Sequence, residues 1–317
     1  MKPAPLIWLE YVGFRVAIGI VGLVPLTALS GVATATGNTA YYLLWPIRRR
    51  AIRHLRFAGL AKTHVEAARI ARKTFVNLTL TALEILKSEQ VLSRSTSTVD
   101  FAAPFVELQK IADLDKGFIV VTAHYGNWEL ASFLHGVNLP RLHCVFRPLD
   151  NPYLNRWLSR RREALGQHLV PKRAAARQLL RALRAREGVV ILADQHSRRS
   201  EGAITTFFGQ QARTHTAPAM LKLKTGAPLF VAALKRAGEP FRFEYVFRGP
   251  LEIEATGDKV ADAQALTQLY TSALEEIVRE DPTQWLWMHR RWLGVRSARR
   301  PRQGKRQRPV AENLNGA

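Results

Sequence analysis

Two side chains that can transfer protons stand close together near the middle of the chain, His124 and Glu129, within FIVVTAHYGNWE. Residues 118–122 are apolar or β-branched and predict a buried strand that ends near His124. Gly126 predicts a turn, and Asn127 is the predicted N-cap of a helix with Glu129 in its first turn. We expect this crossing to place the carboxylate within hydrogen-bonding distance of the imidazole. Such a contact fixes the tautomer and raises the basicity of the other ring nitrogen, which suits a general base for a hydroxyl.

A core histidine beside an unrelated surface glutamate is the alternative, and the strand–turn–helix setting favours the catalytic interpretation. A metal hydrolase built on His124, Asp194 and His196 is a second alternative, but the chain has no H-E-x-x-H or H-x-H-x-D grouping. The single cysteine, Cys144, lies in the apolar segment LHCVF and is expected to be a buried strand residue. We therefore predict no metal and no bound cofactor.

The elements that must position these residues alternate between strands and helices. Thr63 with Glu66 is a capping-box signature for a long helix to about residue 87. Ser- and Thr-rich residues 88–100 predict a loop or the start of a strand, and a polar loop is expected from the strand end at Asp194 and Gln195 to Thr206. Further expected helices are 104–114, 215–225 and 260–280; further expected strands are 141–146, 189–193, 228–234 and 241–247. This alternation predicts an α/β fold with a layered, mixed or mostly parallel sheet flanked by helices.

The N-terminal segment is uncharged from residue 16 to residue 37, which is long enough for a spanning helix. Pro25 and the nearby glycines weaken that helix, so a kinked or half-inserted segment is an open alternative. Residues 38–58 predict an amphipathic, arginine-rich helix, and the positive-inside rule then places the body of the protein on the cytoplasmic side. We expect a membrane anchor and interface helix at 1–58, a catalytic domain at 59–295 and a disordered basic tail at 296–317.

The chain is strongly basic: of its 317 residues, 47 are Lys or Arg and 25 are Asp or Glu, a net charge of +22. That charge predicts an acidic partner, such as anionic membrane lipid, an acidic protein or nucleic acid. The alternative to an enzyme is a basic protein that binds membranes or nucleic acid and has no enzyme activity. The chain has no recognised nucleic-acid-binding motif, and its uncharged N-terminal segment also speaks against nucleic acid.

Several motifs come in a single order along nearly the whole chain, and together they resemble the bacterial late acyltransferases of lipid A biosynthesis. They are HYGNWE at 124–129, FRPLDNP at 146–152, ADQ at 193–195, FFG at 207–209 with Thr214 after it, TGAP at 225–228 and QWLWMHRRW at 284–292. That family belongs to a wider group of membrane acyltransferases with His-x4-Asp/Glu. The glycerol-phosphate members usually carry a Phe-Pro-Glu-Gly-Thr-Arg block, and this chain instead has ADQHSRRSEG.

The resemblance implies roles for individual residues. His124 would deprotonate an acceptor hydroxyl, and Glu129 would orient His124 and stabilise the imidazolium. Arg147 would hold an anionic group of the substrate. Asp194, at a strand end, would bind the acceptor or pair with Arg147, with a simple turn role as the alternative. Gly126 and Asn127 are candidate hydrogen-bond donors to the oxyanion. His289 and Arg290 are candidates for lining the site, but a basic cluster that faces the membrane would explain these two residues equally well.

No serine or cysteine nucleophile is apparent, so we expect the acceptor hydroxyl to attack an acyl thioester directly, without an acyl-enzyme. The resemblance implies a donor chain on acyl carrier protein, with coenzyme A as the alternative carrier. The basic residues between 156 and 186 suit docking of that acidic carrier, or a solvated face beside lipid headgroups. The implied acceptor is a lipid A precursor at the cytoplasmic face of the inner membrane; an ornithine lipid, glycolipid or lysophospholipid is the alternative.

Overall fold

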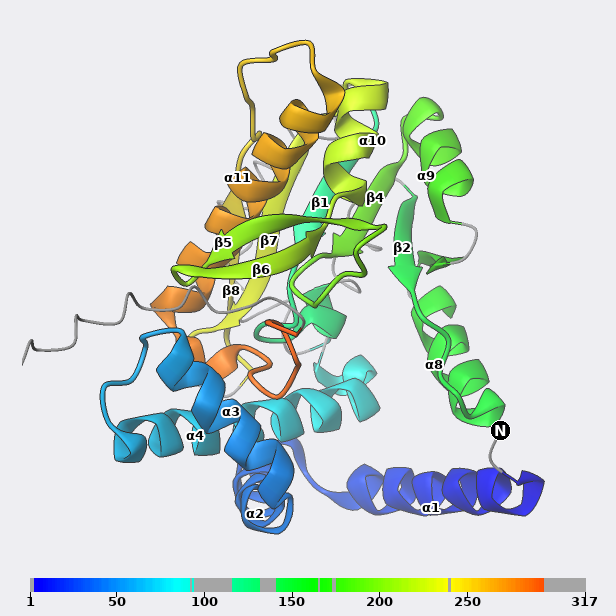
Figure 1. The fold of residues 1–317 in the computed structure, drawn as a ribbon. Coiled ribbons are helices and arrows are strands. Elements are labelled where there is room, and N and C mark those ends of the chain that lie inside the picture. The colour runs from blue at the N-terminus through cyan, green and yellow to red at the C-terminus, as the bar shows by residue number, and fades with distance from the viewer. Residues whose placement is uncertain are drawn as a thin grey trace, which may run out of the picture.

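A six-stranded sheet forms the centre of the protein in the computed structural model, with strand order β3-β2-β4-β1-β7-β8 (Figure 1). The structure describes residues 3–91, 93, 116–131, 141–164, 166–172, 175–238 and 241–293. The first five strands in this order run parallel, and β8 is antiparallel to β7. The strands are β1 (Phe118–Thr122), β2 (Leu142–Phe146), β3 (Gln167–Pro171), β4 (Gly188–Leu192), β7 (Leu229–Arg236) and β8 (Phe243–Arg248).

The two faces of this sheet are buried against different helices. Ile119 and Val121 of β1 belong to the cluster that contains buried residues of α9 (Ala175–Arg184), α10 (Ala217–Thr225) and α11 (Lys259–Glu280). Phe118 and Val120 belong to a second cluster, with Leu130 of the helix that begins at Trp128. Burial on both faces explains why β1 is a continuous apolar run rather than an alternating one. The predicted α/β layered sheet is confirmed.

A long helix, α4 (His64–Leu86), passes beside the loop that follows β1. Its N-cap is Thr63, whose side chain accepts a hydrogen bond from the Glu66 amide at 3.1 Å, and the Glu66 carboxylate accepts one from the Lys62 amide at 2.9 Å. The predicted cap and the predicted end of the helix are therefore confirmed. Further along α4, Thr81 donates to the carbonyl oxygen of Gly126 at 3.0 Å, so this helix helps to fix the turn after His124.

The uncharged N-terminal window is divided into two helices, which corrects the expected single span over residues 16–37. α1 (Ala4–Leu23) ends before Pro25, and α2 (Leu29–Leu43) starts a new direction after the short η1 (Leu26–Ala28). A proline removes a backbone donor and clashes with the preceding turn, so the break at Pro25 is expected. α1 has no buried residue, whereas α2 buries Leu29, Ala33 and Gly37. Within the described part of the chain, α1 alone is long and apolar enough to cross a bilayer.

The predicted arginine-rich helix over 38–58 also divides, because α2 runs to Leu43 and α3 (Trp45–Phe57) follows. α3 is amphipathic as expected: it buries Ala51, Ile52 and Leu55 and exposes arginines. Cys144 is buried in β2 as predicted, and burial raises the pKa of its thiol to about 12. The expected helix at 104–114 and the basic tail at 296–317 lie outside the described residues, as do residues 92 and 94–100 of the predicted 88–100 loop. Residues 88–91 are helical, so the loop prediction is wrong for them.

The segment predicted as a polar loop before FFG is a β-hairpin instead, formed by β5 (Gly202–Phe207) and β6 (Gln210–His215). Phe208 and Gly209 make its two-residue turn with φ of 53° and 68°. Two positive φ values in succession suit the right-handed twist of paired strands, and glycine takes such a value readily. Phe207 and Phe208 pack against Trp285, so the FFG motif joins the hairpin to the C-terminal segment. Other elements that were not predicted individually are β3, α8 (Pro152–Ala164) and α9.

Candidate active site

His124 and Asp194 meet at the carboxyl ends of two neighbouring parallel strands. The register pairs Thr122 of β1 with Leu192 of β4, and each functional residue lies two positions beyond its paired residue. Nδ1 of His124 is 2.9 Å from one carboxylate oxygen of Asp194. The backbone amide of His124 donates to the other oxygen, also at 2.9 Å. The histidine side chain is 22% exposed and the aspartate 2%, so substrate can reach the ring while its partner is shielded from water.

A third donor fixes the Asp194 carboxylate from the C-terminal segment. Nε1 of Trp285 donates to it at 2.9 Å, and Trp285 forms an antiparallel bridge with Tyr125. Burial by itself would raise the pKa of Asp194, but the charge of His124 and these hydrogen bonds lower it to about 2. Asp194 is therefore an anion at neutral pH.

The same pair sets the protonation of His124. Burial lowers the pKa of the imidazole, but the charge and hydrogen bond of Asp194, together with the charge of Glu129, outweigh burial and leave the pKa above its ordinary value. With Nδ1 held by a carboxylate, the proton-accepting nitrogen is Nε2. This arrangement has the geometry that a general base with a buried orienting acid requires.

Glu129 does not occupy the orienting position that the sequence predicts. Both of its oxygens are bonded to Arg162 of α8 in a bidentate pair, and one of them lies 3.0 Å from Nε of the arginine. The arginine side chain is 16% exposed and the glutamate side chain 11%. The helix that begins at Trp128 turns the glutamate toward α8, while the strand register brings Asp194 to Nδ1. Glu129 thus acts on His124 through its charge and fixes Arg162 beside the site.

The two expected oxyanion donors have other partners. The amide of Gly126 donates to the Gln284 carbonyl at 3.1 Å, and the amide of Asn127 donates to the Leu234 carbonyl at 3.0 Å. The Asn127 side chain donates to Glu84 at 2.6 Å and accepts from the Leu130 amide at 2.9 Å, which confirms its predicted role as N-cap. These contacts make Gly126 and Asn127 supports of the loop, so the oxyanion assignment is corrected.

Arg147 directly follows β2. Among the described residues its ionic partner is Asp150 at 3.8 Å, and both side chains are more than 80% exposed. Asp194, offered as a partner for Arg147, is instead bonded to His124 and Trp285. The exposed guanidinium of Arg147 remains available to an incoming anion, and its proposed substrate contact stays a prediction.

Of the C-terminal residues, His289 and Arg291 lie near enough to the pair for the charge of Asp194 to act on both, whereas Arg290 is exposed. His289 is near enough for the charges of Asp194 and His124 to act on it; burial, the largest effect, lowers its pKa to about 4, so it is neutral at pH 7. Arg291 is 1% exposed and donates to the carbonyls of Gln195 and Arg213 at 3.2 and 2.7 Å, so it joins the loop after Asp194 to the hairpin.

Sequence reasoning missed four side chains of the site as individuals. Two of them hold the acids: Trp285 is hydrogen-bonded to Asp194, and Arg162 is bonded to Glu129. The other two contact the imidazole of His124. Nε2 of Gln195 is 3.3 Å from both ring nitrogens, and the ring centroid of Trp128 is 5.3 Å from that of His124. Trp128, Gln195 and Trp285 belong to the quoted motifs, which was the available signal. Arg162 lies in a basic run that gives no sign of a buried partner. Among the described residues, no group of three His, Cys, Asp or Glu side chains is arranged to hold a metal ion.

Comparison with known proteins places the chain in a family. A family model described as "Bacterial lipid A biosynthesis acyltransferase" matches residues 3–294. The chain belongs to this family. The resemblance carried by HYGNWE, ADQ and QWLWMHRRW is thereby confirmed at the level of the family.

Two curated relatives illustrate the range of the similarity. The chain is 26% identical over 197 residues to a phosphatidylinositol mannoside acyltransferase of Mycolicibacterium smegmatis, covering 61% of this chain and 62% of that protein. It is 25% identical over 178 residues to the lipid A biosynthesis lauroyltransferase of Escherichia coli, covering 56% of each. The matched regions thus span about three fifths of these relatives' length.

Proposed function

We propose that the protein is a membrane-associated acyltransferase that transfers a fatty acyl chain from a carrier thioester to a hydroxyl of a lipid A-type acceptor. The observation that carries this proposal is the His124–Asp194 pair at 2.9 Å, with a part-exposed imidazole at a strand end. Family membership supports the reaction class, and the absence of a nucleophile elbow favours direct transfer.

The chemistry follows from the site. Nε2 of His124 accepts the proton of the acceptor hydroxyl as its oxygen attacks the thioester carbonyl carbon. The imidazolium that forms is stabilised by the Asp194 carboxylate on Nδ1. When the carbon–sulfur bond of the tetrahedral intermediate breaks, Nε2 returns the proton to the leaving thiolate. The products are an ester and a free thiol, with His124 neutral again.

The amide of Gln195 lies against the imidazole and replaces Gly126 and Asn127 as the proposed polar contact for the reacting oxygen. Neutral His289 supplies a second polar group beside the pair. Exposed arginines of α8 and α9 support the proposed docking of acidic acyl carrier protein: Arg156, Arg160, Arg177, Arg181 and Arg184. Arg162 is removed from that docking surface because Glu129 holds it.

We also propose attachment at the inner membrane with the catalytic site facing the cytoplasm. α1 is apolar with no buried residue, and arginines of α3 follow it in sequence. The mannoside acyltransferase relative supports one alternative acceptor, a phosphorylated glycolipid other than a lipid A precursor.

The test is an acyl-transfer assay with the full chain in detergent, using labelled acyl carrier protein thioester or acyl coenzyme A. Acceptors would be a lipid A precursor, a mannosylated phosphoinositide, a lysophospholipid and an ornithine lipid. Transfer to one acceptor, lost in His124→Ala and retained in His64→Ala at the exposed start of α4, supports the proposal. Transfer that persists in His124→Ala removes the base assignment, and activity abolished by a chelator would contradict the metal-independent mechanism.

A further inference from the structure

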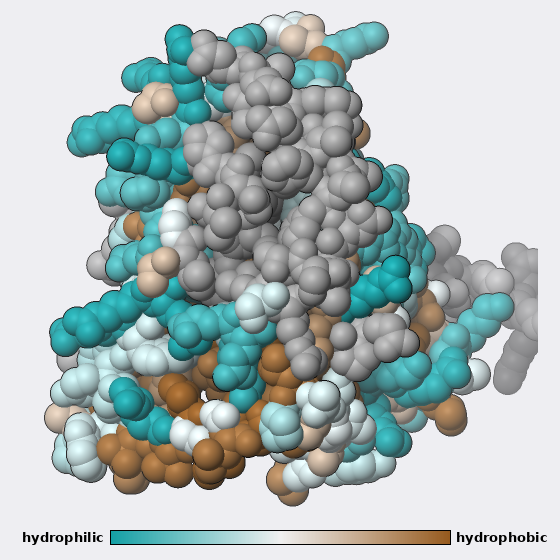
Figure 2. All heavy atoms as spheres, turned by 180° about the vertical axis from the view of Figure 1, so that it is seen from behind, coloured by the Kyte–Doolittle hydropathy of each residue, from teal (hydrophilic) through white to brown (hydrophobic). Residues whose placement is uncertain are grey.

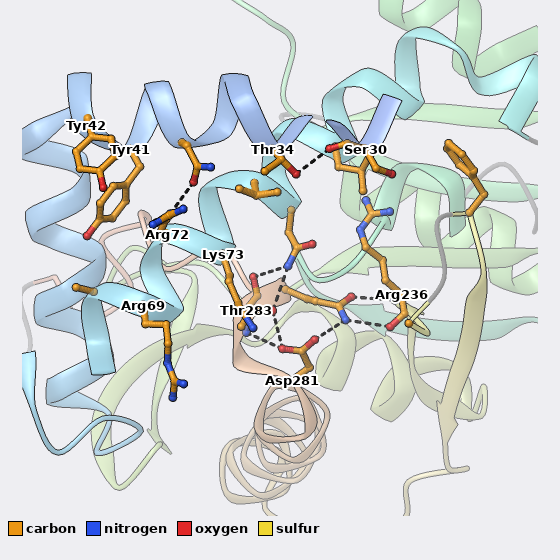
Figure 3. Close-up of a pocket in the computed structure, with 18 residues that line it drawn as sticks. Ser30, Thr34, Tyr41, Tyr42, Arg69, Arg72, Lys73, Arg236, Asp281 and Thr283 are labelled. Atoms are coloured by element: carbon orange, nitrogen blue, oxygen red, sulfur yellow. Dashed lines mark hydrogen bonds between the residues drawn. The ribbon is translucent and has the colours of Figure 1, made fainter. Parts of the chain in front are cut away.

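A cavity of about 760 Å³ lies beside the candidate active site, and the mechanism above makes no use of it. Figure 3 shows it between α2, α4, the end of β7 and η3 (Pro282–Gln284). Its volume is in the range that holds a small-molecule headgroup. Its lining combines polar side chains with apolar ones such as Tyr41, Val76 and Leu80.

Three positive side chains follow one another along the α4 wall of this cavity: Arg69, Arg72 and Lys73 (Figure 3). Their spacing of three and four residues places them on one face of the helix. Arg72 donates from Nε to the Asn38 side chain at 2.8 Å, which steadies it against α2. Among the described residues, none of the three has a carboxylate within 4.0 Å. We name Arg69, Arg72 and Lys73 the α4 cation row.

The other charged side chains of the lining are already matched. Arg236 is bonded to both oxygens of buried Glu84, at 2.6 and 2.7 Å. The Asp281 carboxylate accepts from the Thr283 hydroxyl and from the Gln284 amide, each at 2.7 Å. These hydrogen bonds leave the negative charge of Asp281 in place, so the lining has one remaining negative charge and the three positive charges of the α4 cation row. The cavity therefore favours an anion.

The cation row leads toward His124 along a single helix face. Asn77 is one turn beyond Lys73, an axial distance of about 6 Å. Asn77 and Gln284 line both this cavity and the small hollow that contains His124. The cavity therefore adjoins the hollow at His124 across Asn77 and Gln284. A lipid headgroup held at the cation row would lie next to the base, with its anionic group several bonds from the reacting hydroxyl.

The cavity also adjoins the surface suited to a membrane. Tyr42 and Leu43, at the end of α2, are 61% and 75% exposed. Figure 2 shows hydrophobic residues gathered along the lower end of the molecule, where Figure 1 places α1 and α2. Helices α8 and α9, which carry the exposed arginines, lie on the other side of the structure from α3 in Figure 1. A lipid approaching from the bilayer meets the cavity first, whereas a carrier protein has its own basic surface.

We propose that the α4 cation row binds a phosphate group on the headgroup of the lipid acceptor and so orients its hydroxyl toward His124. This inference rests on the proposed function for the identity of the acceptor. Bound phosphate oxygens would accept charge-assisted hydrogen bonds from Lys73 and the two arginines. The acyl chains of the acceptor would stay beside α1 and α2.

The test variant is Arg69→Gln/Lys73→Gln, which removes two charges and spares the Arg72–Asn38 contact. The matched control is Lys224→Gln/Lys259→Gln, two exposed lysines at the end of α10 and the start of α11. Figure 1 places α10 at the opposite end of the molecule from α2. Binding of a radiolabelled, phosphorylated lipid A precursor to the full chain in detergent is compared with binding of the same lipid after phosphate removal. Inorganic phosphate serves as the probe for a free anion.

We expect the unmodified protein to prefer the phosphorylated lipid about tenfold or more, and the test variant to lose that preference while the control keeps it. In turnover, KM for the acceptor should rise with little change in KM for the acyl donor. Equal binding of the phosphorylated lipid by test variant and unmodified protein would overturn the inference. Three other results would also overturn it. The test and control variants could lose the same amount of lipid binding, or inorganic phosphate could displace the lipid with an affinity equal to that of the lipid. The third is a rise in KM for the acyl donor alone.

Failure of the proposed function has a different signature. If the unmodified protein transfers no acyl chain to any acceptor, the function falls, but lipid binding requires no turnover and still decides the role of the α4 cation row.

Discussion

At the scale of single residues, the site depends on which carboxylate holds His124. Asp194 receives three hydrogen bonds, from the backbone and ring of His124 and from Trp285, and it is shielded from water. Glu129, the acid of the His-x4-Glu motif, is bonded to Arg162 instead. The two acids therefore have separable tasks: Asp194 fixes the tautomer, and Glu129 holds a guanidinium and adds negative charge near the ring.

Asp194→Asn should reduce acyl transfer by about a hundredfold or more, because the amide no longer stabilises the imidazolium. The pKa of His124 is raised in the folded protein, and neutral His124 is the active form, so the rate falls as pH drops through that pKa. Without the Asp194 charge the pKa falls, and the acidic limb of the kcat/KM profile moves about one pH unit or more downward. The imidazole titration can be followed by NMR.

Glu129→Gln provides the comparison. It should move the His124 titration in the same direction but by less, because Glu129 contributes through its charge alone. A larger shift in Glu129→Gln than in Asp194→Asn would contradict the assignment of Asp194 as the orienting residue.

At the scale of elements, the loop after β1 is held by close backbone contacts with its neighbours. Gly126 has φ of 57°, and a Cβ atom there would lie 1.9 Å from the carbonyl oxygen of Leu234. No side chain fits between these backbones. The carbonyl of Gly126 is in turn bonded to Thr81, so β7 and α4 both determine where His124 points.

Gly126→Ala should lower the free energy of unfolding by about 3 kcal/mol or more, because backbone strain and a clash with backbone act together. Gly226→Ala is the matched control: its φ is 69°, but nothing lies within 4 Å of the added Cβ. That change should cost only about 1–2 kcal/mol. Equal losses in denaturant unfolding would show that the close approach of Leu234 does not matter.

The ion pair between Glu84 and Arg236 joins α4 to β7 in the interior, with the glutamate side chain fully buried. Glu84→Ala should destabilise the protein by about 3–5 kcal/mol, since it leaves the guanidinium largely buried without its partner and frees the Asn127 amide. Thermal unfolding of Glu84→Ala and Glu84→Ala/Arg236→Met decides the cause. If the double variant is no more stable than the single one, the unpaired charge is not the origin of the loss.

At the scale of the whole molecule, an apolar helix lies outside the folded body. α1 buries none of its residues, and its contacts with the body include the rings of Tyr11 and Phe14 against Tyr153 and Trp157 of α8. By its length and composition, this helix is able to cross a bilayer or to lie at its surface.

Deletion of residues 1–24 should therefore abolish co-sedimentation with vesicles of phosphatidylethanolamine and phosphatidylglycerol, while the melting temperature in detergent changes by only a few degrees. Tyr11→Ala/Phe14→Ala, which keeps α1 but removes its ring contacts, serves as the control and should still sediment. Vesicle binding retained after the deletion would show that α3 or another surface anchors the protein.

The local sequence by itself determined much of this protein. Apolar runs such as residues 118–122, the Thr63 cap and the Asn127 cap specify their elements because the causes are local: burial on both faces and unsatisfied amides in a first turn. The order of the motifs indicated the family. The same local reasoning selected His124 correctly as the residue at the end of a strand.

Only the tertiary structure decided the partners. β1 and β4 lie 70 residues apart at His124 and Asp194, and only their parallel register brings these side chains together. Glu129 is five positions from His124, yet the direction of its helix sends it to Arg162. The α4 cation row becomes a candidate binding site for the same reason: α2, β7 and η3 form a cavity around it next to the base. Sequence spacing limits which side chains can meet, and the packing of distant elements determines which of them do.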